Sequence, residues 1–368
     1  MGISYGRSIA RGVLAYARIE RRWQVFVEEL NVLDLQRGNL PDGVIVHGSK
    51  TNAVELLAHY HIPAVNVSGM QPLSDVPSVL PYDEKIGRLG AEHFLERGFR
   101  HFGFWGIFGH GYSTRRQQGF TAAIEEAGYP CAVWQGSSTV IEADRQADRA
   151  ARIDWIRNAP RPIGIMACND GRARSVYTSA MEAGLRVPDE VAILGVDNDE
   201  LHCETAGLSL SSIDICLETI GFVAAEMLEA RMNGEPAATR PTLVAPKAVV
   251  VRQSTDVLAV PDTEVAAALR FIRESATRGI GVDDVANATA LSRRMLERRF
   301  RQVVGRTLHD EIRRVQLDKV CMLLNSTDMD LRRIALACGL RSASYLSAVF
   351  HSGMRITPSA YRRQFRAS

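Results

Sequence analysis

The sequence predicts a chain in two parts, an α/β domain over residues 1–255 and an all-α domain with two helix-turn-helix motifs over residues 263–368. Short apolar runs alternate with amphipathic stretches through the first part, no strand-like run follows Pro261, and the formal charge changes sign there. Residues 262–368 carry 19 Lys and Arg against 11 Asp and Glu, a balance of +8, whereas the other residues carry 25 against 31, a balance of −6. A basic module joined to an acidic one indicates that the tail contacts a polyanion.

Composition and cysteine spacing exclude several classes of protein. Of the 368 residues, 46% are apolar and 23% are charged, which is unlike disordered, collagen-like or disulfide-scaffold chains. No stretch reaches the roughly 18 apolar residues of a membrane span, and Arg7, Arg11 and Arg18 argue against a signal peptide. The six cysteines form no Cys-x-x-Cys pair, which predicts buried thiols in a reducing compartment. We therefore expect a cytoplasmic protein with no membrane segment, metal or cofactor.

The α/β part is predicted from apolar runs and from helical periodicity. The runs are almost uniformly apolar, which is typical of parallel strands covered on both faces. The predicted strands are Trp23–Glu28, Gly43–Val46, Ala64–Val67, His101–Trp105, Ala132–Gln135, Ile163–Ala167, Val191–Val196 and Leu243–Val251. The predicted helices between them are Ile86–Arg97, Arg116–Ala127, Arg172–Ala183 and Ile215–Met232.

The chain begins with a helical pattern over Met1–Ala17 that no strand precedes. An α/β sheet that begins with a helix leaves an uncovered edge. We therefore hypothesise that a first strand precedes Met1 in the native protein. Mass spectrometry that finds Met1 at the native amino terminus would contradict this hypothesis.

Polar residues follow two of the predicted strands. Asn169 and Asp170 come after Ile163–Ala167, and an Asp-Asn-Asp run that begins at Asp197 comes after Val191–Val196. Ligands of open α/β sheets bind outside the carboxyl ends of the strands. These strand ends are therefore the predicted ligand site.

The tail contains an internal repeat. At an offset of 49, similar residues follow positions 282, 285, 286, 290 and 291; they are Leu331, Ile334, Ala335, Gly339 and Leu340. At an offset of 50, similar residues follow Leu296, Phe300 and Thr307; they are Leu346, Phe350 and Thr357. Each copy is predicted to be a short helix, a turn and a second helix that begins after an N-cap serine, Ser292 or Ser342. A helix over Thr307–Leu324 joins the copies, and residues 256–262 are the predicted linker.

The second helix of the first copy has an apolar and a charged face. Leu296 and Phe300 face the core, while the opposite face carries Arg293, Arg294, Glu297, Arg298 and Arg301. Four arginines on a protruding helix suit the DNA major groove, where Arg pairs with guanine edges and phosphates. The alternative is a solvated charged face. The duplicated architecture and the local charge favour DNA binding.

The second copy carries a family signature, Ile334-Ala335-x-x-x-Gly339-Leu340-x-Ser342-x-Ser344-Tyr345-Leu346-Ser347-x-x-Phe350, followed by Thr357-Pro358-x-x-Tyr361-Arg362. It resembles the second helix-turn-helix of AraC-family activators, over about a hundred residues. With the first copy, the resemblance implies DNA contacts from Ser292, Arg293, Arg294, Glu297, Arg298, Arg301, Arg341, Ser342, Ser344 and Tyr345. Arg355 stands where the family usually has Gly, and in a left-handed conformation we expect it to tilt the last helix or contact a phosphate.

A second set of motifs spans most of the α/β part. It comprises Gly90-Ala91-Glu92-His93-x-x-Glu96-Arg97-Gly98-x-Arg100, Arg116-x-x-Gly119-Phe120, Ala167-Cys168-Asn169-Asp170, Val187-Pro188-x-x-Val191-x-x-x-Gly195-Val196-Asp197-Asn198 and Val251-Arg252-x-Ser254-Thr255. As a set it resembles the periplasmic-binding-protein-like sensor domains of LacI-type repressors. A sensor of this type before an AraC-type tail is the order found in xylose-operon regulators. The resemblance implies two α/β lobes that close on a small sugar.

Sugars present neighbouring hydroxyls to carboxylates and guanidinium groups, and a C–H face to an aromatic ring. Asp170 and Asp197 are the predicted hydroxyl acceptors, Arg116 the donor and Tyr112 the stacking ring. The other predicted ligand residues are Tyr5, Tyr82, Asp83, Asn169 and Asn198. Each has a structural alternative: the aspartates as helix caps, Arg116 as a surface ion pair and Tyr112 as a core residue.

We predict a sugar-controlled transcription regulator, an activator of genes for xylose or a related pentose. It is expected to bind double-stranded operator DNA as a homodimer, with RNA polymerase as a further partner. Two other classes stay open, a sugar-modifying α/β enzyme with a DNA-binding tail and a constitutive architectural DNA binder. The sequence lacks a phosphate loop, a His-Glu-x-x-His motif and a Gly-x-Gly-x-x-Gly after a strand, so we do not expect an enzyme.

Overall fold

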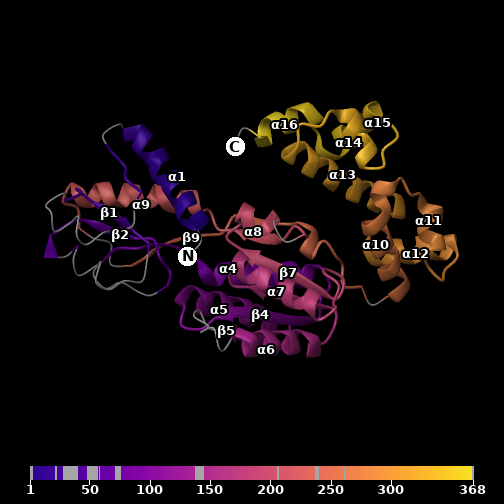
Figure 1. Ribbon diagram of the computed structural model, residues 1–368, viewed down its shortest axis with the longest axis horizontal. Coiled ribbons are helices and arrows are strands. Elements are labelled where there is room, and N and C mark those ends of the chain that lie inside the picture. The colour runs from indigo at the N-terminus through magenta and orange to yellow at the C-terminus, as the bar shows by residue number, and fades with distance from the viewer. Residues whose placement is uncertain are drawn as a thin grey trace. The chain divides into compact units, whose positions relative to one another are not determined.

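The protein, seen in a computed structural model, divides into two compact units, Met1–Val257 and Leu258–Ser368 (Figure 1). We refer to them as the α/β unit and the helical unit and describe each by itself. The structure describes residues 3–20, 23–27, 40–47, 57, 59–70, 76–136, 145–204, 207–236, 240–260 and 262–366.

The larger lobe of the α/β unit is built on a six-stranded sheet in the order β10-β8-β7-β6-β4-β5. All neighbours pair in parallel except β10, which is antiparallel to β8. The central strands are buried along their whole length, because helices cover both faces of the sheet. The strands are β4 (His101–Ile107), β5 (Cys131–Gly136), β6 (Ile163–Ala167), β7 (Val191–Val196), β8 (Ser211–Asp214) and β10 (Ala248–Val250).

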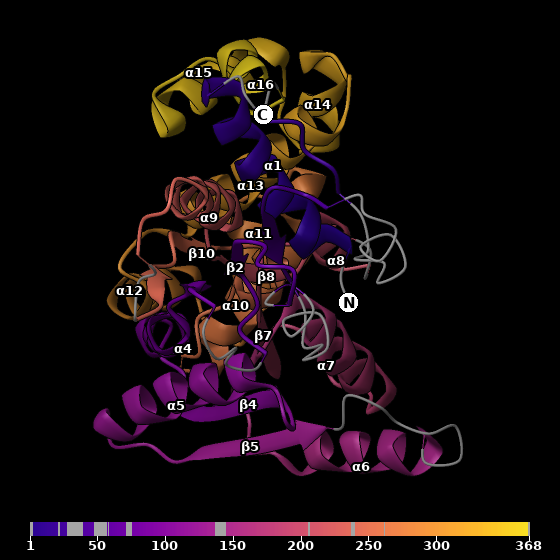
Figure 2. The same ribbon diagram turned by 90° about the vertical axis from the view of Figure 1, so that its left-hand side faces the viewer.

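Two pairs of helices form the outer layers of this lobe. On one face, α4 (Asp83–Glu96) packs against α5 (Gly111–Glu126), which lies along β4 (Figure 2). On the other, α6 (Arg145–Asn158) packs against α7 (Asp170–Glu182), which contacts β6 and β7. The short helices α8 (Glu200–Glu204) and η2 (Gln253–Thr255) complete the lobe as the structure describes it.

The smaller lobe consists of two helices and two short parallel strand pairs. Helix α1 (Ile3–Glu20) packs along α9 (Leu217–Met232), and α9 also contacts β1 (Val44–Val46), β2 (Ala64–Asn66) and β3 (Val79–Pro81). Strand β1 pairs with β2, and β3 pairs with β9 (Thr242–Val244). The lobe lies at the left of Figure 1.

The described chain passes between the lobes three times, from β3 to α4, from β8 to α9 and from β9 to β10. At the second crossing Cys216 adopts a left-handed conformation with φ 57° just before α9 begins. Because parallel strands of both lobes end near these crossings, the carboxyl ends of the strands face the space between the lobes.

Two strand predictions are wrong. Residues 23–27 of the predicted strand Trp23–Glu28 form no strand, and Phe26 and Val27 are exposed; Glu28 lies outside the described residues. The predicted strand Leu243–Val251 is instead the two strands β9 and β10, which belong to different lobes. An apolar run does not reveal that the chain crosses a hinge within it. The sequence patterns also missed β3, β8, α6 and α8, which are short or polar.

The helical unit contains two helix-turn-helix motifs, which confirms the predicted fold class. They are α11 (Val282–Asn287) with α12 (Arg293–Val304), and α14 (Leu331–Ala337) with α15 (Ala343–Met354). Helix α13 (Leu308–Ser326) joins them. Helix α10 (Thr263–Ser275), with η3 (Ala276–Arg278), precedes the first motif, and α16 (Pro358–Arg366) follows the second.

The second helices of the two motifs, α12 and α15, which we call the recognition helices, end in the same way. Gly305 after α12 and Arg355 after α15 both adopt the left-handed conformation, with φ of 79° and 61°. The left-handed conformation expected for Arg355 is therefore present. An L side chain in this conformation costs about 1–2 kcal/mol relative to Gly.

The two motifs have separate apolar cores that meet on α13. Ile312 belongs to the first core and Leu317 to the second. Between them the buried Gln316 donates hydrogen bonds from Nε2 to the carbonyl of Ala276 at 2.9 Å and to that of Gly339 at 3.5 Å. One amide therefore ties the first half of the unit to the turn of the second motif.

Gly339→Ala is expected to destabilise the helical unit more than Gly305→Ala. Both glycines have positive φ, so each substitution costs about 1–2 kcal/mol of backbone strain. A Cβ at Gly339 would in addition lie 2.5 Å from the nitrogen of Gly279 and 2.7 Å from the oxygen of Thr277, whereas one at Gly305 meets no atom within 4 Å. Overpacking of this kind adds about 1–3 kcal/mol. Urea unfolding of both variants measures the difference, and equal losses would contradict it.

Candidate functional site

A cavity of about 200 Å³ lies in the α/β unit, between its two lobes. Its walls come from the ends of β1, β2, β3, β6 and β7 and from α1, α5, α7, α8 and α9. The lining residues are Tyr5, His47, Ser68, Gly69, Met70, Pro81, Tyr112, Arg116, Asn169, Gly171, Asp197, Asp199, His202 and Leu217.

Arg116 is a buried cation in this wall with several partners. Its side chain is only 3% exposed, and its guanidinium donates from Nε to Asp83 Oδ1 at 2.9 Å and from Nη1 to the carbonyl of Cys168 at 2.5 Å. Nη1 also lies 3.4 Å from Asp197 Oδ1. Burial opposes the charge, but the carboxylates of Asp83 and Asp197 raise the pKa of Arg116 above its ordinary value. The guanidinium is therefore a fixed positive charge.

Asp83 and Tyr82, both predicted sugar ligands, do not line the cavity. The fully buried carboxylate of Asp83 accepts hydrogen bonds from Arg116 and, at 2.8 and 3.0 Å, from Arg115. Its oxygens are therefore occupied by two arginines. Tyr82 is half-buried at the start of α4, with Lys85 Nζ 4.9 Å from the centre of its ring.

Asp197 lines the cavity directly. It stands at the carboxyl end of β7 with φ 105°, an unusual conformation for a residue other than glycine, and its side chain is 20% exposed. Burial raises the pKa of Asp197 to about 6, although the nearby Arg116 opposes this rise. Its carboxylate is the acidic group that Arg116 holds at the cavity wall.

Asp170 and Asn198 are close to the cavity but are not among its lining residues. The Asp170 carboxylate accepts hydrogen bonds from the Ser212 hydroxyl at 2.6 Å and from the backbone N–H of Asp199 at 2.7 Å. Burial, together with the Asp197 carboxylate, raises the pKa of Asp170 well above its ordinary value. Asn198 Oδ1 accepts from Arg252 at 2.8 Å. The structure therefore gives Asp170 and Asn198 partners within the larger lobe, where they hold the β7–α8 turn.

Aromatic and amide groups complete the wall. Asn169 caps α7 by accepting from the N–H of Arg172 at 2.8 Å, and its Nδ2 donates to the Tyr112 hydroxyl at 3.2 Å. The Arg116 guanidinium lies 5.1 Å from the centre of the Tyr112 ring. Tyr5, from the smaller lobe, packs on His47 with ring centres 4.7 Å apart. The cavity thus has a tyrosine from each lobe.

Five of the nine predicted sugar residues therefore line the cavity: Tyr5, Tyr112, Arg116, Asn169 and Asp197. The other lining residues of the cavity were not predicted from the sequence. Three of them, Ser68, Gly69 and Met70, follow β2. The strand-end rule that found Asp197 would also have found Ser68. The same rule does not apply to His202, because this residue lies on helix α8 and not at the end of a strand.

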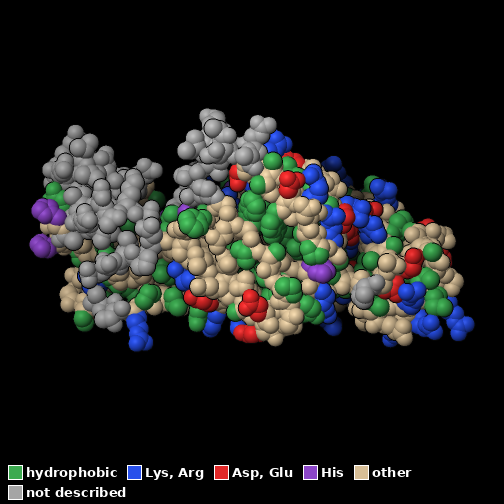
Figure 3. All heavy atoms as spheres, turned by 90° about the horizontal axis from the view of Figure 1, so that it is seen from below, with side chains coloured by type: hydrophobic (Ala, Val, Ile, Leu, Met, Phe, Trp, Pro, Cys, Tyr) green, Lys and Arg blue, Asp and Glu red, His purple; other side chains and the backbone are tan. Residues whose placement is uncertain are grey.

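The helical unit presents its first recognition helix as predicted from periodicity. Leu296 and Phe300 are fully buried, and the other face of α12 is exposed: Arg293, Arg294, Glu297, Arg298 and Arg301, preceded by the exposed Ser292. Arg293 pairs with Asp283 of α11 at 2.8 Å and with Glu297 at 3.0 Å. In Figure 3 Lys and Arg side chains gather on the surface of this unit, at the right of the view.

The second recognition helix, α15, is uncharged apart from His351. Its N-cap Ser342 accepts from the N–H of Tyr345 at 3.1 Å. Arg341, Ser342 and Ser344 are exposed, and Tyr345 is half-buried. The arginines of this motif thus lie beside α15 and not on it.

Comparison with known proteins gives two domain matches and a relative that spans the chain. Residues 91–255 match the periplasmic binding protein-like domain, and residues 285–364 match a helix-turn-helix domain. The xylose operon regulatory protein of Escherichia coli (strain K12) is 31% identical over 98% of this chain and 94% of its own length. The chain belongs to the family of xylose operon regulatory proteins.

Solved structures agree with the family. That of the xylose-binding transcription activator XylR matches with a TM-score of 0.77 and 31% identity, over 98% of this chain and 95% of that one. A LacI family regulator from Mycobacterium smegmatis, 21% identical, matches 68% of this chain with a TM-score of 0.57 and shows the shared fold. This member of the family is thus a transcription regulator with a periplasmic-binding-protein-like sensor and a helix-turn-helix DNA-binding unit.

No helix in the described part of the chain is long and apolar enough to cross a bilayer. No group of three or more His, Cys, Asp and Glu side chains in that part of the chain is arranged to hold a metal ion.

Asp197→Asn is expected to change how the stability of the ligand-free protein depends on pH. The pKa of Asp197 rises from 3.8 to about 6 on folding, so the folded state binds more protons between these pH values, and stability falls as pH rises through them. At about 1.4 kcal/mol per unit, the loss is at most about 3 kcal/mol by pH 7. Asn keeps the shape and tolerates positive φ, so the variant escapes this loss. In urea unfolding from pH 4 to 7.5, the free energy of unfolding of the variant should rise relative to that of the parent as the pH increases. A difference that stays constant with pH would contradict the prediction.

Proposed function

We propose that this protein is a cytoplasmic, xylose-responsive or related pentose-responsive regulator that activates genes of sugar use, and that the sugar binds in the cavity between the lobes. The observation that carries the proposal is the fixed pair of Arg116 and Asp197 at the cavity wall, with a tyrosine from each lobe beside it. The names of the relative and of the matched structure, which concern xylose, support it.

Each wall residue has a role that its chemistry suits. The Asp197 carboxylate accepts hydroxyl protons of the sugar, and Arg116 donates to a hydroxyl or ring oxygen. Tyr112 or Tyr5 covers the C–H face of the ring. Asp83 and Asp170 act as positioning residues, because one orients Arg116 and the other holds the turn that carries Asp199. Burying the sugar beside an ion pair that is already formed limits the entropy lost on binding.

The proposed mechanism is a shift between open and closed forms of the α/β unit. A sugar that contacts Tyr5 of one lobe and Asp197 of the other binds the closed form better, and only this difference in affinity moves the equilibrium. The three crossings between the lobes act as the hinge. Closure in each protomer of a homodimer changes how the paired helical units meet adjacent DNA half-sites, where they recruit RNA polymerase.

Asp197→Ala is expected to weaken xylose binding about 10- to 100-fold, because a hydrogen bond to a charged group is worth about 1.5–3 kcal/mol. Isothermal titration calorimetry with D-xylose, L-arabinose and D-ribose measures the affinity. Asp154→Ala is the matched control, since Asp154 is exposed on α6 and pairs with the exposed Arg157. Unchanged affinity in Asp197→Ala would show that the site assignment is wrong. Recovery of unaltered xylose by NMR after overnight incubation is expected; turnover would instead support the enzyme alternative.

Arg294→Ala combined with Arg298→Ala is expected to lower specific DNA affinity at least 10-fold, because a bidentate arginine–guanine contact is worth about 1–3 kcal/mol. Both side chains are exposed on α12. The probe is a duplex selected by the full-length protein from a random-sequence library, and binding is followed by fluorescence anisotropy. Arg186→Ala, an exposed arginine of the α/β unit, is the control. Full affinity in the double variant would show that α12 does not read DNA.

A further inference from the structure

A second cavity, of about 190 Å³, lies within the helical unit at the joint between its two helix-turn-helix halves. Its walls come from the turn over residues 279–281, from α13, and from the turn between α14 and α15. Three of its lining residues carry basic side chains: His309 and Arg313 on α13 and Arg341 before α15. No Asp or Glu is among the lining residues that the structure describes.

Arg313 and Arg341 share one aromatic ring. The carbon at the centre of the Arg341 guanidinium lies 4.1 Å from the centre of the Tyr345 ring, and that of Arg313 lies 5.6 Å from it. Arg313 Nη2 also donates to the Tyr345 hydroxyl at 2.5 Å. The aromatic face and hydroxyl hold two positive charges close together, although like charges repel.

Neither guanidinium has a carboxylate partner within 4.0 Å in the described part of the chain, which sets them apart from neighbouring arginines. Arg314, next along α13, pairs with Glu311 and Asp318 at 2.8 Å each. Arg306 pairs with the same Glu311. Asp310, on the same helix, interacts with Arg313 at longer range. Two adjacent cations without a carboxylate within 4.0 Å, at the mouth of a cavity, form a site whose electrostatic energy falls when an anion with several acceptor oxygens enters.

The walls of this cavity are fixed. Gln316, on the cavity floor, hydrogen-bonds to backbone carbonyls of both halves, and Gly339 lies against the backbone of Gly279. The backbone segments that carry the two arginines are therefore held in place. A site that is ordered beforehand binds with a smaller loss of entropy.

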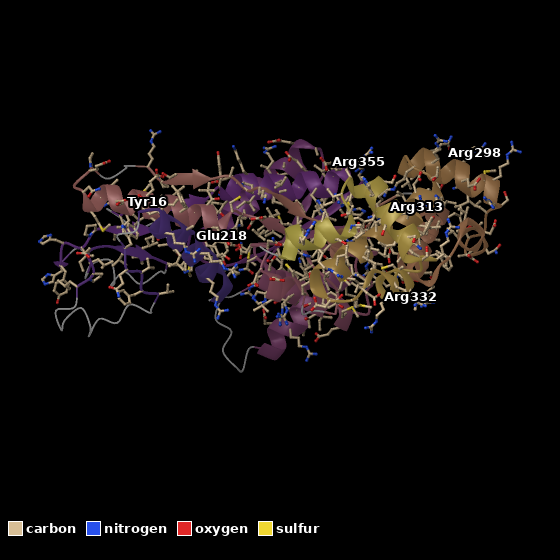
Figure 4. All side chains as sticks on the ribbon, turned by 90° about the horizontal axis from the view of Figure 1, so that it is seen from above. Tyr16, Glu218, Arg298, Arg313, Arg332 and Arg355 are labelled. Carbon is tan, nitrogen blue, oxygen red and sulfur yellow. The ribbon has the colours of Figure 1, made fainter. Side chains whose placement is uncertain are left out.

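We propose that this cavity is a phosphate site that holds one phosphodiester of the operator, on the DNA strand that passes between the two grooves read by α12 and α15. The inference rests on the DNA-binding role of the helical unit. In Figure 4 Arg298 and Arg355 lie toward one edge of the unit and Arg332 toward the opposite edge, with Arg313 between them. Arg313 is on α13, which joins the two motifs, and Arg341 directly precedes α15, so a DNA strand that passes from the groove read by α12 to that read by α15 is expected to pass this cavity. A guanidinium fork matches the geometry of phosphate oxygens.

The test is the salt dependence of DNA binding by the full-length chain. For the selected duplex, the slope of log K against log[salt] is expected to become less steep by about 0.9 in Arg313→Gln, because one phosphate contact is lost. Affinity for specific and for random duplexes is expected to fall by a similar factor, since a phosphate contact carries no sequence information. Arg313→Lys, which keeps the charge, should keep the slope. Arg332→Gln, toward the edge of the unit opposite Arg298, should behave as the parent.

A scan of single methylphosphonates along the duplex locates the contact. One methylphosphonate position between the two half-elements should weaken binding by the parent clearly more than binding by Arg313→Gln, in which only Arg341 remains to contact that phosphate. An unchanged slope together with an unchanged scan in Arg313→Gln would overturn the proposal. If inorganic phosphate raises the melting temperature of the parent but not of Arg313→Gln, while the slope for DNA stays the same, the cavity binds free anions and the proposal is wrong.

The Arg294→Ala and Arg298→Ala double variant, measured beside these, separates this inference from the proposed function. If the double variant keeps full affinity, the DNA-reading role of α12 is wrong. If the double variant loses affinity but Arg313→Gln does not, only the phosphate site is wrong.

Discussion

The buried positive charge of Arg116 is the constraint on which the ligand site depends. An unpaired guanidinium at 3% exposure would cost several kcal/mol, so the fold supplies two carboxylates and a backbone carbonyl to meet it. Asp83 reaches it from the start of α4, Asp197 from the end of β7, and the carbonyl of Cys168 from the end of β6. Elements distant in sequence are therefore held in one arrangement.

This arrangement also explains why the acidic residues near the cavity have different roles. Asp83 is fully buried, has arginines on both oxygens and does not line the cavity. Asp170 is held by Ser212 and by the turn after β7. Only the Asp197 carboxylate is both partly exposed and held by Arg116. A buried ion pair gives little net stability, and its value here is that it fixes the direction of the exposed oxygen.

The strands of the larger lobe could be predicted from the sequence because burial on both faces leaves uniform apolar runs, as in β6 and β7. Strand β8, Ser-Ser-Ile-Asp, could not, since its hydroxyl side chains are buried through bonds to residues more than 40 positions away: the Ser211 hydroxyl donates to the carbonyl of Arg252, and the Ser212 hydroxyl donates to Asp170. The same limit applies to the site. Position at a strand end identified Asp197, Asn169 and Asp170 alike, but only tertiary packing decides which of them faces the cavity.

The two motifs of the helical unit have the same geometry but carry their charged side chains in different places. In the first motif the charges lie on the recognition helix, and Asp283 and Glu297 neutralise part of them at Arg293. In the second motif α15 is nearly neutral, and the cations stand at its two ends, Arg341 before it and Arg355 after it in a left-handed conformation that a glycine would adopt without strain. The copies thus share a fold but carry their charges in different places, because packing constrains only the buried face of the second helix of each motif.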